Sequence, residues 1–270
     1  MIQPLPRISI VTPSYNQGKF LEETIRSVIE QDYPNLEFMV IDGGSTDDSV
    51  DVIRKHENQL TYWVSEKDGG QADAIQKGLS RATGDIFAWQ NSDDRYLPGT
   101  LAYVATVFQS KPQLDILFGG WNFIDERGGC ISTRELKRFT VRKLRAGLLV
   151  PPQPAVFFRT SAIGGVGGLN SLKRHVMDYD LYVKIARDDN VFVTSRTLGE
   201  FRVHSGSKTT AEKGIQRQEL RRTRNDLLGK GATLLDKTFW ALCDLEEYGK
   251  DVIHEKLGIF SIRDFLKEGK

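Results

Sequence analysis

Strand-like and helix-like segments alternate through residues 1–98, and this alternation limits the folds that the chain can adopt. An apolar, β-branched run covers 8–12, and Leu21, Ile25 and Val28 then recur at the spacing of a buried helix face. The same order returns in strand patterns at 36–41, 62–64 and 86–89 and in helix patterns at 50–53 and 71–81. Strands joined through helices pair in parallel. The sequence therefore predicts an α/β fold with a mostly parallel central sheet flanked by helices.

Acidic turns follow two of the predicted strands. Asp93 and Asp94 come just after the apolar run 86–89, and the turn 42–47 follows a second apolar run. Open α/β sheets bind ligands at the carboxyl ends of their strands, so both turns are expected at one ligand site. The glycines of the second turn let the backbone approach a ligand closely, and paired carboxylates suit a hard divalent cation. Together the turns predict a site for a nucleoside diphosphate and a divalent metal.

Composition and charge argue against several other classes of protein. The 270 residues are 39% hydrophobic, and 37 basic residues against 36 acidic ones leave a net charge of +1. Such a balance provides no global field for nucleic acid, so no nucleic-acid partner is predicted. Cys130 and Cys243 form no CxxC motif of a zinc site. Because the N-terminus lacks a signal-peptide pattern and no apolar run reaches the roughly 18 to 20 residues of a membrane span, a cytoplasmic location is expected.

Beyond Pro98 the regular alternation weakens. The stretch 119–170 is rich in Gly, Pro and short apolar runs, which predicts short strands and loops around an acceptor cleft. Further along, the pattern predicts a helix at 179–186 and strands at 191–193 and 198–203.

The last part of the chain has a helical, amphipathic and basic pattern. It begins after Ser205 and has a break at 229–231. Residues 205–230 include seven basic and three acidic side chains, a local net charge of +4. A solvated helix face explains such a run, and so does contact of 213–230 with an anionic acceptor or with the inner face of a membrane.

Five short motifs occur in the order seen in a known enzyme family. They are Thr12-Pro13-Ser14-Tyr15-Asn16, Asp42-Gly43-Gly44-Ser45-Thr46-Asp47, Asn91-Ser92-Asp93-Asp94, Met177-Asp178-Tyr179-Asp180-Leu181 and Phe201-Arg202-Val203-His204. In this pattern the chain resembles family 2 glycosyltransferases of the GT-A fold, over about residues 7–207. The resemblance implies an inverting transferase that uses Mn²⁺ or Mg²⁺. It would move a sugar from a nucleoside-diphosphate donor to a hydroxyl of a saccharide or lipid-linked saccharide acceptor, in polysaccharide or glycoconjugate assembly.

The same resemblance divides the chain into a catalytic domain and an extension. The catalytic domain covers 1–207, with a nucleotide-binding half at 1–98 and an acceptor half at 99–207. A helical C-terminal extension follows at 208–270.

The metal site and the donor site are also implied by the resemblance. Asp94 is expected to contact the metal directly, and Asp93 to hold the ribose or the donor sugar. His204 stands where metal-using relatives place a histidine that completes the metal shell, and imidazole together with carboxylate suits manganese.

Recognition of the nucleotide is expected at the turns after the first two strands. Asp42 stands where the family places an acid near the base and ribose, and Asp73 resembles an acid kept near the ribose. Many relatives read Asp-Asp-Gly-Ser, and their second acid contacts the base, whereas this chain has Gly43 at that place. Base recognition is therefore expected from Asp42, backbone groups and Thr12 or Ser14, and the preference for a base stays open.

Inverting transfer needs a carboxylate that takes the proton of the acceptor hydroxyl. Asp178 matches the aspartate of the family's Glu-Asp signature, with Met177 at the place of the glutamate, so Asp178 is the predicted base. Asp180, two positions further along, is the alternative. Trp89, Trp121 and Gln153 are expected to line the donor or acceptor cleft.

Other functions share parts of this pattern. A sugar-1-phosphate nucleotidyltransferase also has paired acids on an α/β fold, but it would carry a glycine-rich, basic loop early in the chain. Residues 12–20 contain only one glycine, Gly18, and one basic residue, Lys19. A non-catalytic nucleotide-sugar binding protein could keep Asp42 and Asp93 without a base. A dinucleotide oxidoreductase is disfavoured, because no GxGxxG follows the first strand.

Overall fold

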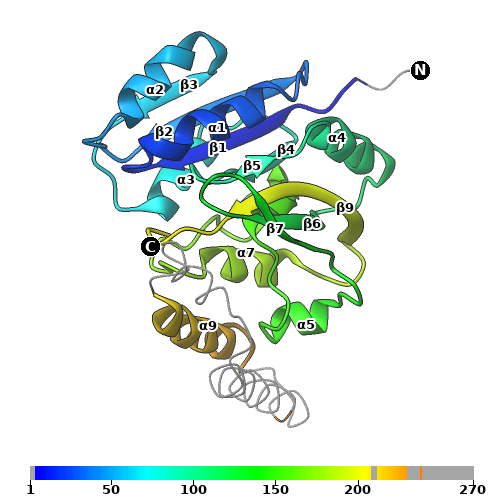
Figure 1. Ribbon diagram of the computed structural model, residues 1–270. Coiled ribbons are helices and arrows are strands. Elements are labelled where there is room, and N and C mark those ends of the chain that lie inside the picture. Colours follow the sequence, from blue (N-terminus) through cyan, green and yellow to red (C-terminus); the bar gives the residue numbers. More distant parts are fainter. Residues whose placement is uncertain (1–3, 208–211, 230–237, 239–270) are drawn as a thin grey trace.

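A computed structural model of the chain describes residues 4–207, 212–229 and 238 (Figure 1). The elements, in chain order, are β1 (Ile8–Ser14), α1 (Gly18–Ile29), β2 (Leu36–Asp42), α2 (Ser49–His56), η1 (Glu57–Gln59), β3 (Tyr62–Ser65), α3 (Gln71–Leu79), β4 (Ile86–Trp89), β5 (Arg95–Tyr96), α4 (Thr100–Ser110), β6 (Ile116–Ile124), β7 (Cys130–Arg134), α5 (Val141–Arg145), η2 (Gln153–Ala155), β8 (Val156–Arg159), α6 (Thr160–Gly165), α7 (Met177–Ile185), β9 (Val191–Arg202) and α9 (Lys213–Leu228). Within the described residues, no helix is long and apolar enough to cross a membrane.

The strands form one nine-stranded sheet in the order β3-β2-β1-β4-β8-β6-β9-β5, with β7 paired to β6. From β3 to β4 neighbouring strands are parallel, as the strand and helix alternation predicts. Beyond β4 the sheet is mixed, because β8 runs antiparallel to both β4 and β6. The α/β prediction is therefore confirmed, with the parallel part of the sheet concentrated in the N-terminal half.

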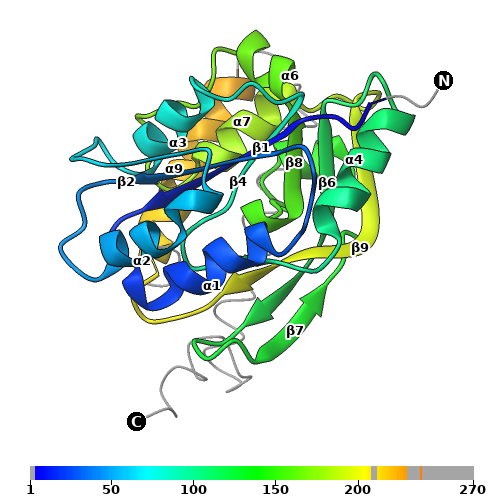
Figure 2. The same ribbon diagram turned by 90° about the horizontal axis from the view of Figure 1, so that it is seen from above.

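Helices cover both faces of the sheet and bury a core on each (Figure 2). On one face α1, α2 and α4 pack their apolar side chains, including Leu21, Ile53 and Leu101, against the strands. On the other face α3, α6 and α7 contribute residues such as Ile75. Helix α3 lies so close to β1 that a Cβ on Gly78 would be 2.5 Å from a methyl of Val11. This close packing fixes the last turn of α3 against the middle of β1.

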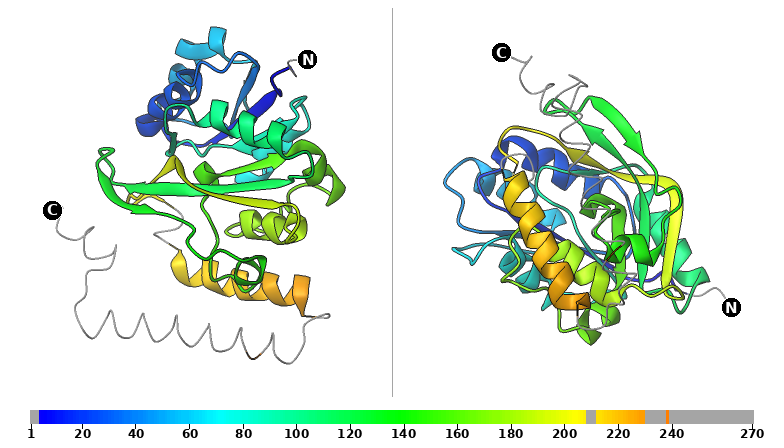
Figure 3. Two further views of the ribbon diagram at one scale, coloured as in Figure 1. Left: turned by 90° about the vertical axis from the view of Figure 1, so that its right-hand side faces the viewer. Right: turned by 90° about the horizontal axis from the view of Figure 1, so that it is seen from below.

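Helix α9 packs against α7, on the side away from α1 (Figure 3). Its Leu220 lies over Gly147, where an added Cβ would come within 2.5 Å of the leucine side chain. Its Arg224 is buried and donates a hydrogen bond of 3.1 Å to the carbonyl of Ala146. The helix ends at Leu228, next to the predicted break. The rest of the predicted extension, apart from residue 238, lies outside the described residues.

Candidate functional site

The turns after β1, β2, β3 and β4 meet at one edge of the sheet and open into a cleft of about 890 Å³. This is the edge at which the sequence predicts a ligand site. Loops before β8 and α7 form another wall, and α9 closes the cleft through Gln216 and Leu220. The polar side chains around the cleft include Ser14, Asn16, Asp68, Asp93, Gln153 and Asp178.

Asp93 lies on the cleft wall and pairs with His204. The turn after β4 carries Asp93, whose side chain is 18% exposed, and His204 follows the end of β9. The His204 Nε2 lies 3.1 Å from the Asp93 Oδ2. The ring of Phe20, on α1, packs at 4.7 Å from the imidazole ring. His204 is 5% exposed and does not itself line the cleft, so it is held against the Asp93 carboxylate from the protein side.

Asp94 points into the protein and does not line the cleft. It is 1% exposed, and its Oδ1 accepts a hydrogen bond of 2.8 Å from the backbone N–H of Arg202. Its Oδ2 accepts another, of 3.2 Å, from the Nδ2 of Asn91. Burial, together with the nearby charge of Asp93, raises the pKa of Asp94 well above its usual range. This position does not fit the direct metal contact that the sequence predicts for Asp94, because a ligand in the cleft reaches Asp93 first.

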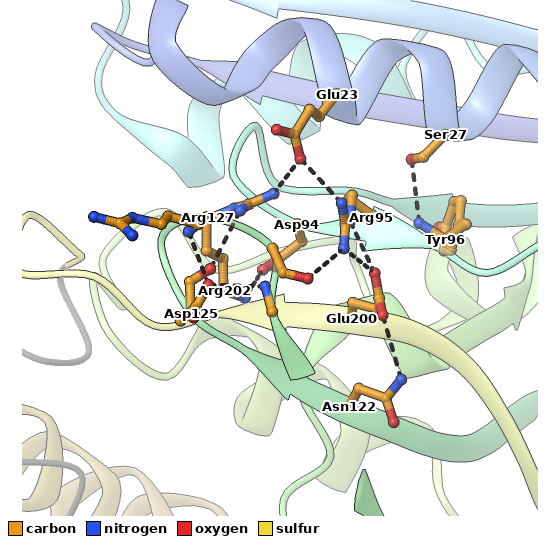
Figure 4. A network of polar contacts seen from close by, with 12 residues as sticks. Glu23, Ser27, Asp94, Arg95, Tyr96, Asn122, Asp125, Arg127, Glu200 and Arg202 are labelled. Carbon is orange, nitrogen blue, oxygen red and sulfur yellow. Dashed lines mark hydrogen bonds and ion pairs between the residues drawn. The ribbon is translucent and has the colours of Figure 1, made fainter. Parts of the chain in front are cut away.

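The buried guanidinium of Arg202 ties the acidic turn to the rest of the fold (Figure 4). Arg202 is 1% exposed, and its Nε donates to the carbonyl of Asp93 at 2.8 Å. Its second amino group lies 2.6 Å from a carboxylate oxygen of Glu23, on α1. Glu23 also binds Arg95, which pairs with Glu200 of β9. Because this network connects α1, the turn and β9, it fixes where Asp93 stands relative to His204.

The donor atoms at the cleft suit a divalent cation only if a ligand completes its shell. Among the described residues, no three His, Cys, Asp or Glu side chains gather in a way that could hold a metal ion. Asp93 and His204 supply one carboxylate and one imidazole, which suit Mn²⁺. Oxygens of a bound diphosphate would have to provide the remaining ligands.

Asp42 organises the turn after β2 from inside the protein. It is fully buried, and its Oδ2 accepts hydrogen bonds from the backbone N–H groups of Gly44 and Ser45, at 3.1 and 2.9 Å. The hydroxyls of Ser45 and Ser65 donate to the same carboxylate. With these bonds Asp42 shapes the loop that carries Gly43 and Gly44 to the cleft, but it does not itself line the cleft.

The other predicted nucleotide ligands lie at different depths. Ser14 lines the cleft, whereas Thr12 is fully buried inside β1 and does not. Asp73, in the first turn of α3, accepts a hydrogen bond from the N–H of Gly69 at 3.0 Å and lies 3.7 Å from Lys77. It too is absent from the cleft lining. Of the predicted nucleotide ligands, only Ser14 and Asp93 therefore reach the cleft surface.

Asp178, in the first turn of α7, faces the cleft. Burial raises the pKa of its carboxyl to about 6, and the negative charge of Glu219 on α9 adds to the rise. The N–H of Tyr179 donates a hydrogen bond of 2.7 Å to the Asp178 Oδ1. This bond lowers the pKa of Asp178 and so opposes the effect of burial. Asp180 is buried instead, 2.6 Å from the Nζ of Lys184. Only Asp178 of the two can meet a ligand in the cleft.

Helix α9 also secures the loop in front of Asp178. Both carboxylate oxygens of Glu219 accept hydrogen bonds from this loop, from the N–H groups of Arg174 at 2.9 Å and His175 at 3.1 Å. The His175 Nε2 lies 3.0 Å from Glu212, at the start of the same helix. Helix α9 thus contributes to the cleft, although the predicted domain boundary at 207 places it outside the catalytic domain.

Sequence patterns find only some of the cleft residues. Trp121 and Gln153 line the cleft as expected. Trp89 does not, because it is buried in the core, where its ring stacks on Phe158 at 5.6 Å. Asp68 lines the cleft but is not among the predicted ligands. Its position between a predicted strand and the start of a helix indicates that it lies at the ligand-binding edge of the sheet.

Comparison with known sequences shows the family. The pattern of the family described as Glycosyl transferase family 2 matches residues 9–162. An uncharacterized glycosyltransferase of Mycobacterium tuberculosis (strain H37Rv) is 34% identical over 198 residues, which cover 72% of this chain and 71% of that protein. An uncharacterized glycosyltransferase of Rickettsia typhi is 25% identical over 211 residues, which cover 76% of this chain and 66% of that protein.

Comparison with solved structures shows the GT-A type of fold. The structure of S. aureus TarS, residues 1–349, in complex with UDP-GlcNAc matches with a TM-score of 0.62 and 18% identity, over 88% of this chain and 79% of that one. The mannosyltransferase PcManGT from Pyrobaculum calidifontis, in complex with GDP-Man and Mn²⁺, matches with a TM-score of 0.60 and 18% identity. The match covers 97% of this chain and 83% of that one. The predicted architecture is confirmed.

Proposed function

The chain belongs to glycosyl transferase family 2, and on that premise we propose that it is an inverting, metal-dependent glycosyltransferase. Its donor is a nucleoside-diphosphate sugar, and its acceptor is a hydroxyl of a saccharide or lipid-linked saccharide. One observation carries the proposal: Asp93, which contacts His204, and the raised-pKa carboxyl of Asp178 line a single cleft. Asp93 with His204 suits a diphosphate and its cation, and the Asp178 carboxyl suits the hydroxyl group of an acceptor.

The donor would bind across the carboxyl ends of β1, β2 and β4. Asp93 and His204 would hold the cation, and the cation would neutralise the negative charge that grows on the diphosphate as it leaves. The start of α3, where Gln71 lines the cleft, offers the backbone N–H of that residue toward phosphate oxygens. The bound UDP-GlcNAc of TarS and the bound GDP-Man and Mn²⁺ of PcManGT, in proteins of similar fold, support this class of donor.

Asp178 would act as the general base. As the acceptor oxygen bonds to the anomeric carbon and the bond to the diphosphate oxygen breaks, the Asp178 carboxylate takes the hydroxyl proton. A base whose pKa is about 6 is ionised near neutral pH and still holds a proton better than an exposed aspartate does. Attack from the face opposite the diphosphate inverts the anomeric configuration.

Contact with an anionic membrane surface through α9 belongs to the same proposal, since a lipid-linked acceptor would lie there. Arg217, Arg221 and Arg222 are exposed on this helix. Arg224, which has the same charge in the sequence pattern, is only 4% exposed and binds the carbonyl of Ala146, so it takes no part in a surface contact. A role in polysaccharide or glycoconjugate assembly follows from this acceptor class.

A product assay separates this function from the alternatives. The protein is incubated with Mn²⁺, saccharide acceptors and a panel of nucleoside-diphosphate sugars, and the released nucleotide is identified. A glycosyltransferase releases the nucleoside diphosphate, and NMR of the product shows the inverted anomer. A nucleotidyltransferase would instead form pyrophosphate from a nucleoside triphosphate and a sugar 1-phosphate. A binding protein would bind a donor and release nothing, which would contradict the proposed activity.

A further inference from the structure

The carboxylate of Asp68 occupies the space beside Gly43 on the cleft wall. Gly43 follows β2, Asp68 lies between β3 and α3, and both line the cleft. A Cβ on residue 43 would lie 2.9 Å from the Asp68 Oδ2 and 3.1 Å from its Oδ1. Gly43 does not have the positive φ of its neighbour Gly44. A larger residue at 43 would therefore displace the Asp68 carboxylate from its present position.

One oxygen of Asp68 is held by the protein, and the other is available to a ligand. The backbone N–H of Gly70 donates to the Oδ1 at 2.7 Å, which fixes the orientation of the carboxylate. Among the described residues, no donor forms a hydrogen bond with the Oδ2, the oxygen closest to Gly43. An oriented, half-buried acceptor therefore faces the cleft.

The distance along the sheet edge places Asp68 at the base end of a bound nucleotide. Asp93 follows β4, and Gly43 follows β2, with β1 between these strands. At about 4.8 Å from strand to strand, the ends of β4 and β2 are about 10 Å apart along the edge, and β3, which precedes Asp68, lies one strand further. A nucleotide held by its diphosphate at Asp93 would extend its ribose and base toward Gly43 and Asp68. Tyr15, 62% exposed after β1, offers an aromatic face on the way.

We propose that Asp68 selects the nucleobase by accepting a hydrogen bond from a ring N–H. The inference rests on the proposed function. A carboxylate only accepts, so it suits uracil and thymine, with their N3–H, and guanine, with its N1–H and amino group. Cytosine and adenine present a ring nitrogen lone pair at the corresponding position, which a carboxylate repels. The donor is accordingly a uridine, thymidine or guanosine diphosphate sugar.

Calorimetric titrations with UDP, dTDP, GDP, CDP and ADP, each with Mn²⁺, test this selection. The wild-type protein is expected to bind at least one of the first three about 10- to 100-fold more tightly than CDP and ADP, the worth of a hydrogen bond to a charged group. Asp68→Ala should lose this factor for the preferred nucleotide, and Asp68→Asn, whose amide can donate to cytosine, should narrow the preference over CDP. The control is Glu66→Gln, in a residue of the same loop that does not line the cleft.

A double-mutant cycle with Gly43 tests the spatial relation itself. In the presence of Asp68, Gly43→Ala adds a methyl that displaces the carboxylate, so nucleotide affinity should fall. In the Asp68→Ala background the same substitution should change affinity by less than about threefold, because nothing remains to be displaced. Additive losses in the cycle, unchanged affinities in Asp68→Ala, or a wild-type preference for CDP or ADP would each overturn the inference. A wild-type protein that binds none of the five nucleotides would instead contradict the proposed function.

Discussion

The imidazole Nε2 of His204 lies 3.1 Å from the carboxylate Oδ2 of Asp93, although 111 positions separate the two residues in the chain. Arg202 makes this contact possible, because its N–H holds Asp94 and its side chain holds the carbonyl of Asp93. The acidic pair thus has divided roles. Asp93 faces the cleft, and Asp94 anchors the turn from within.

Removing the Arg202 guanidinium should cost more stability than removing an exposed one. Arg202→Met removes the donor of the Asp93 carbonyl and one of the two partners of the half-exposed Glu23, and we expect a loss of about 1 to 3 kcal/mol in the free energy of unfolding. Arg26→Met, which breaks an exposed pair with Glu30, should lower this free energy by no more than about 0.5 kcal/mol. Urea unfolding measures both variants, and similar losses in the two would contradict the anchoring role.

Transfer should depend on the protonation of Asp178. Because its pKa is raised to about 6 and the base must be ionised, kcat/KM should fall as the pH drops through about 6. The stability of the fold should depend on pH in the opposite direction. Asp178 contributes its full stabilisation of the folded state below the unfolded pKa of 3.8, and this stabilisation is lost as the pH rises through about 6.

Glu219 provides a sharper form of the same test. Its negative charge raises the pKa of Asp178, so Glu219→Gln should move the acid limb of the pH profile to lower pH. Asp226→Asn is the matched control, since Asp226 lies on the same helix and pairs with Lys173. A profile that moves equally in both variants would show that Glu219 does not act on Asp178 directly.

Asp178→Asn should separate turnover from donor binding. The amide keeps the size of the carboxyl but cannot take a proton, so turnover should fall by about 10² to 10⁴. The affinity for the nucleoside diphosphate should hardly change, since the proposed donor site lies at Asp93 and not at Asp178. Steady-state kinetics and calorimetry give the two readouts. Near-normal transfer by Asp178→Asn would refute its role as base, and Asp180 would be the next candidate.

Membrane contact of α9 should depend on its exposed arginines. Changing Arg217, Arg221 and Arg222 together to Gln should weaken binding to vesicles that contain anionic lipid, by roughly 1 kcal/mol for each residue that reaches the surface. The effect should shrink as salt rises. Sedimentation with vesicles measures it. Equal binding of the wild-type protein to neutral and anionic vesicles would exclude this contact.

Sequence patterns predict the N-terminal half of the fold well because its structure is local. The runs at β1, β2 and β4 are mainly apolar and almost entirely buried, and the buried residues Leu21, Ile25 and Val28 of α1 follow one helix face. In the second half the pairing is not local. The polar residues Thr194, Ser195 and Arg196 suggest two separate strands in the sequence. Strand β9 nevertheless continues through them, because β6 pairs with the residues on both sides.

The site could be predicted only in part for a similar reason. That acids gather at the sheet edge follows from strand order, but which of Asp93 and Asp94 faces the cleft depends on hydrogen bonds from Arg202, more than 100 residues later. Asp68 and Gly43 meet through the packing of neighbouring turns. The contribution of α9 to the cleft arises from its contacts with α7 and the loop before it. No local pattern encodes such contacts.

Metal-dependent nucleotide binding by Asp93→Asn tests the central claim most directly. Thermal unfolding of the wild-type protein is measured with a bound nucleoside diphosphate, with and without Mn²⁺, beside Asp93→Asn and Asp94→Asn. At 100 times the dissociation constant, the nucleotide should stabilise the wild-type protein by about 2.7 kcal/mol in the presence of Mn²⁺. Asp93→Asn should lose this metal-dependent gain, and Asp94→Asn should keep it on a less stable fold. The reverse result, with the gain kept in Asp93→Asn and lost in Asp94→Asn, would contradict the account.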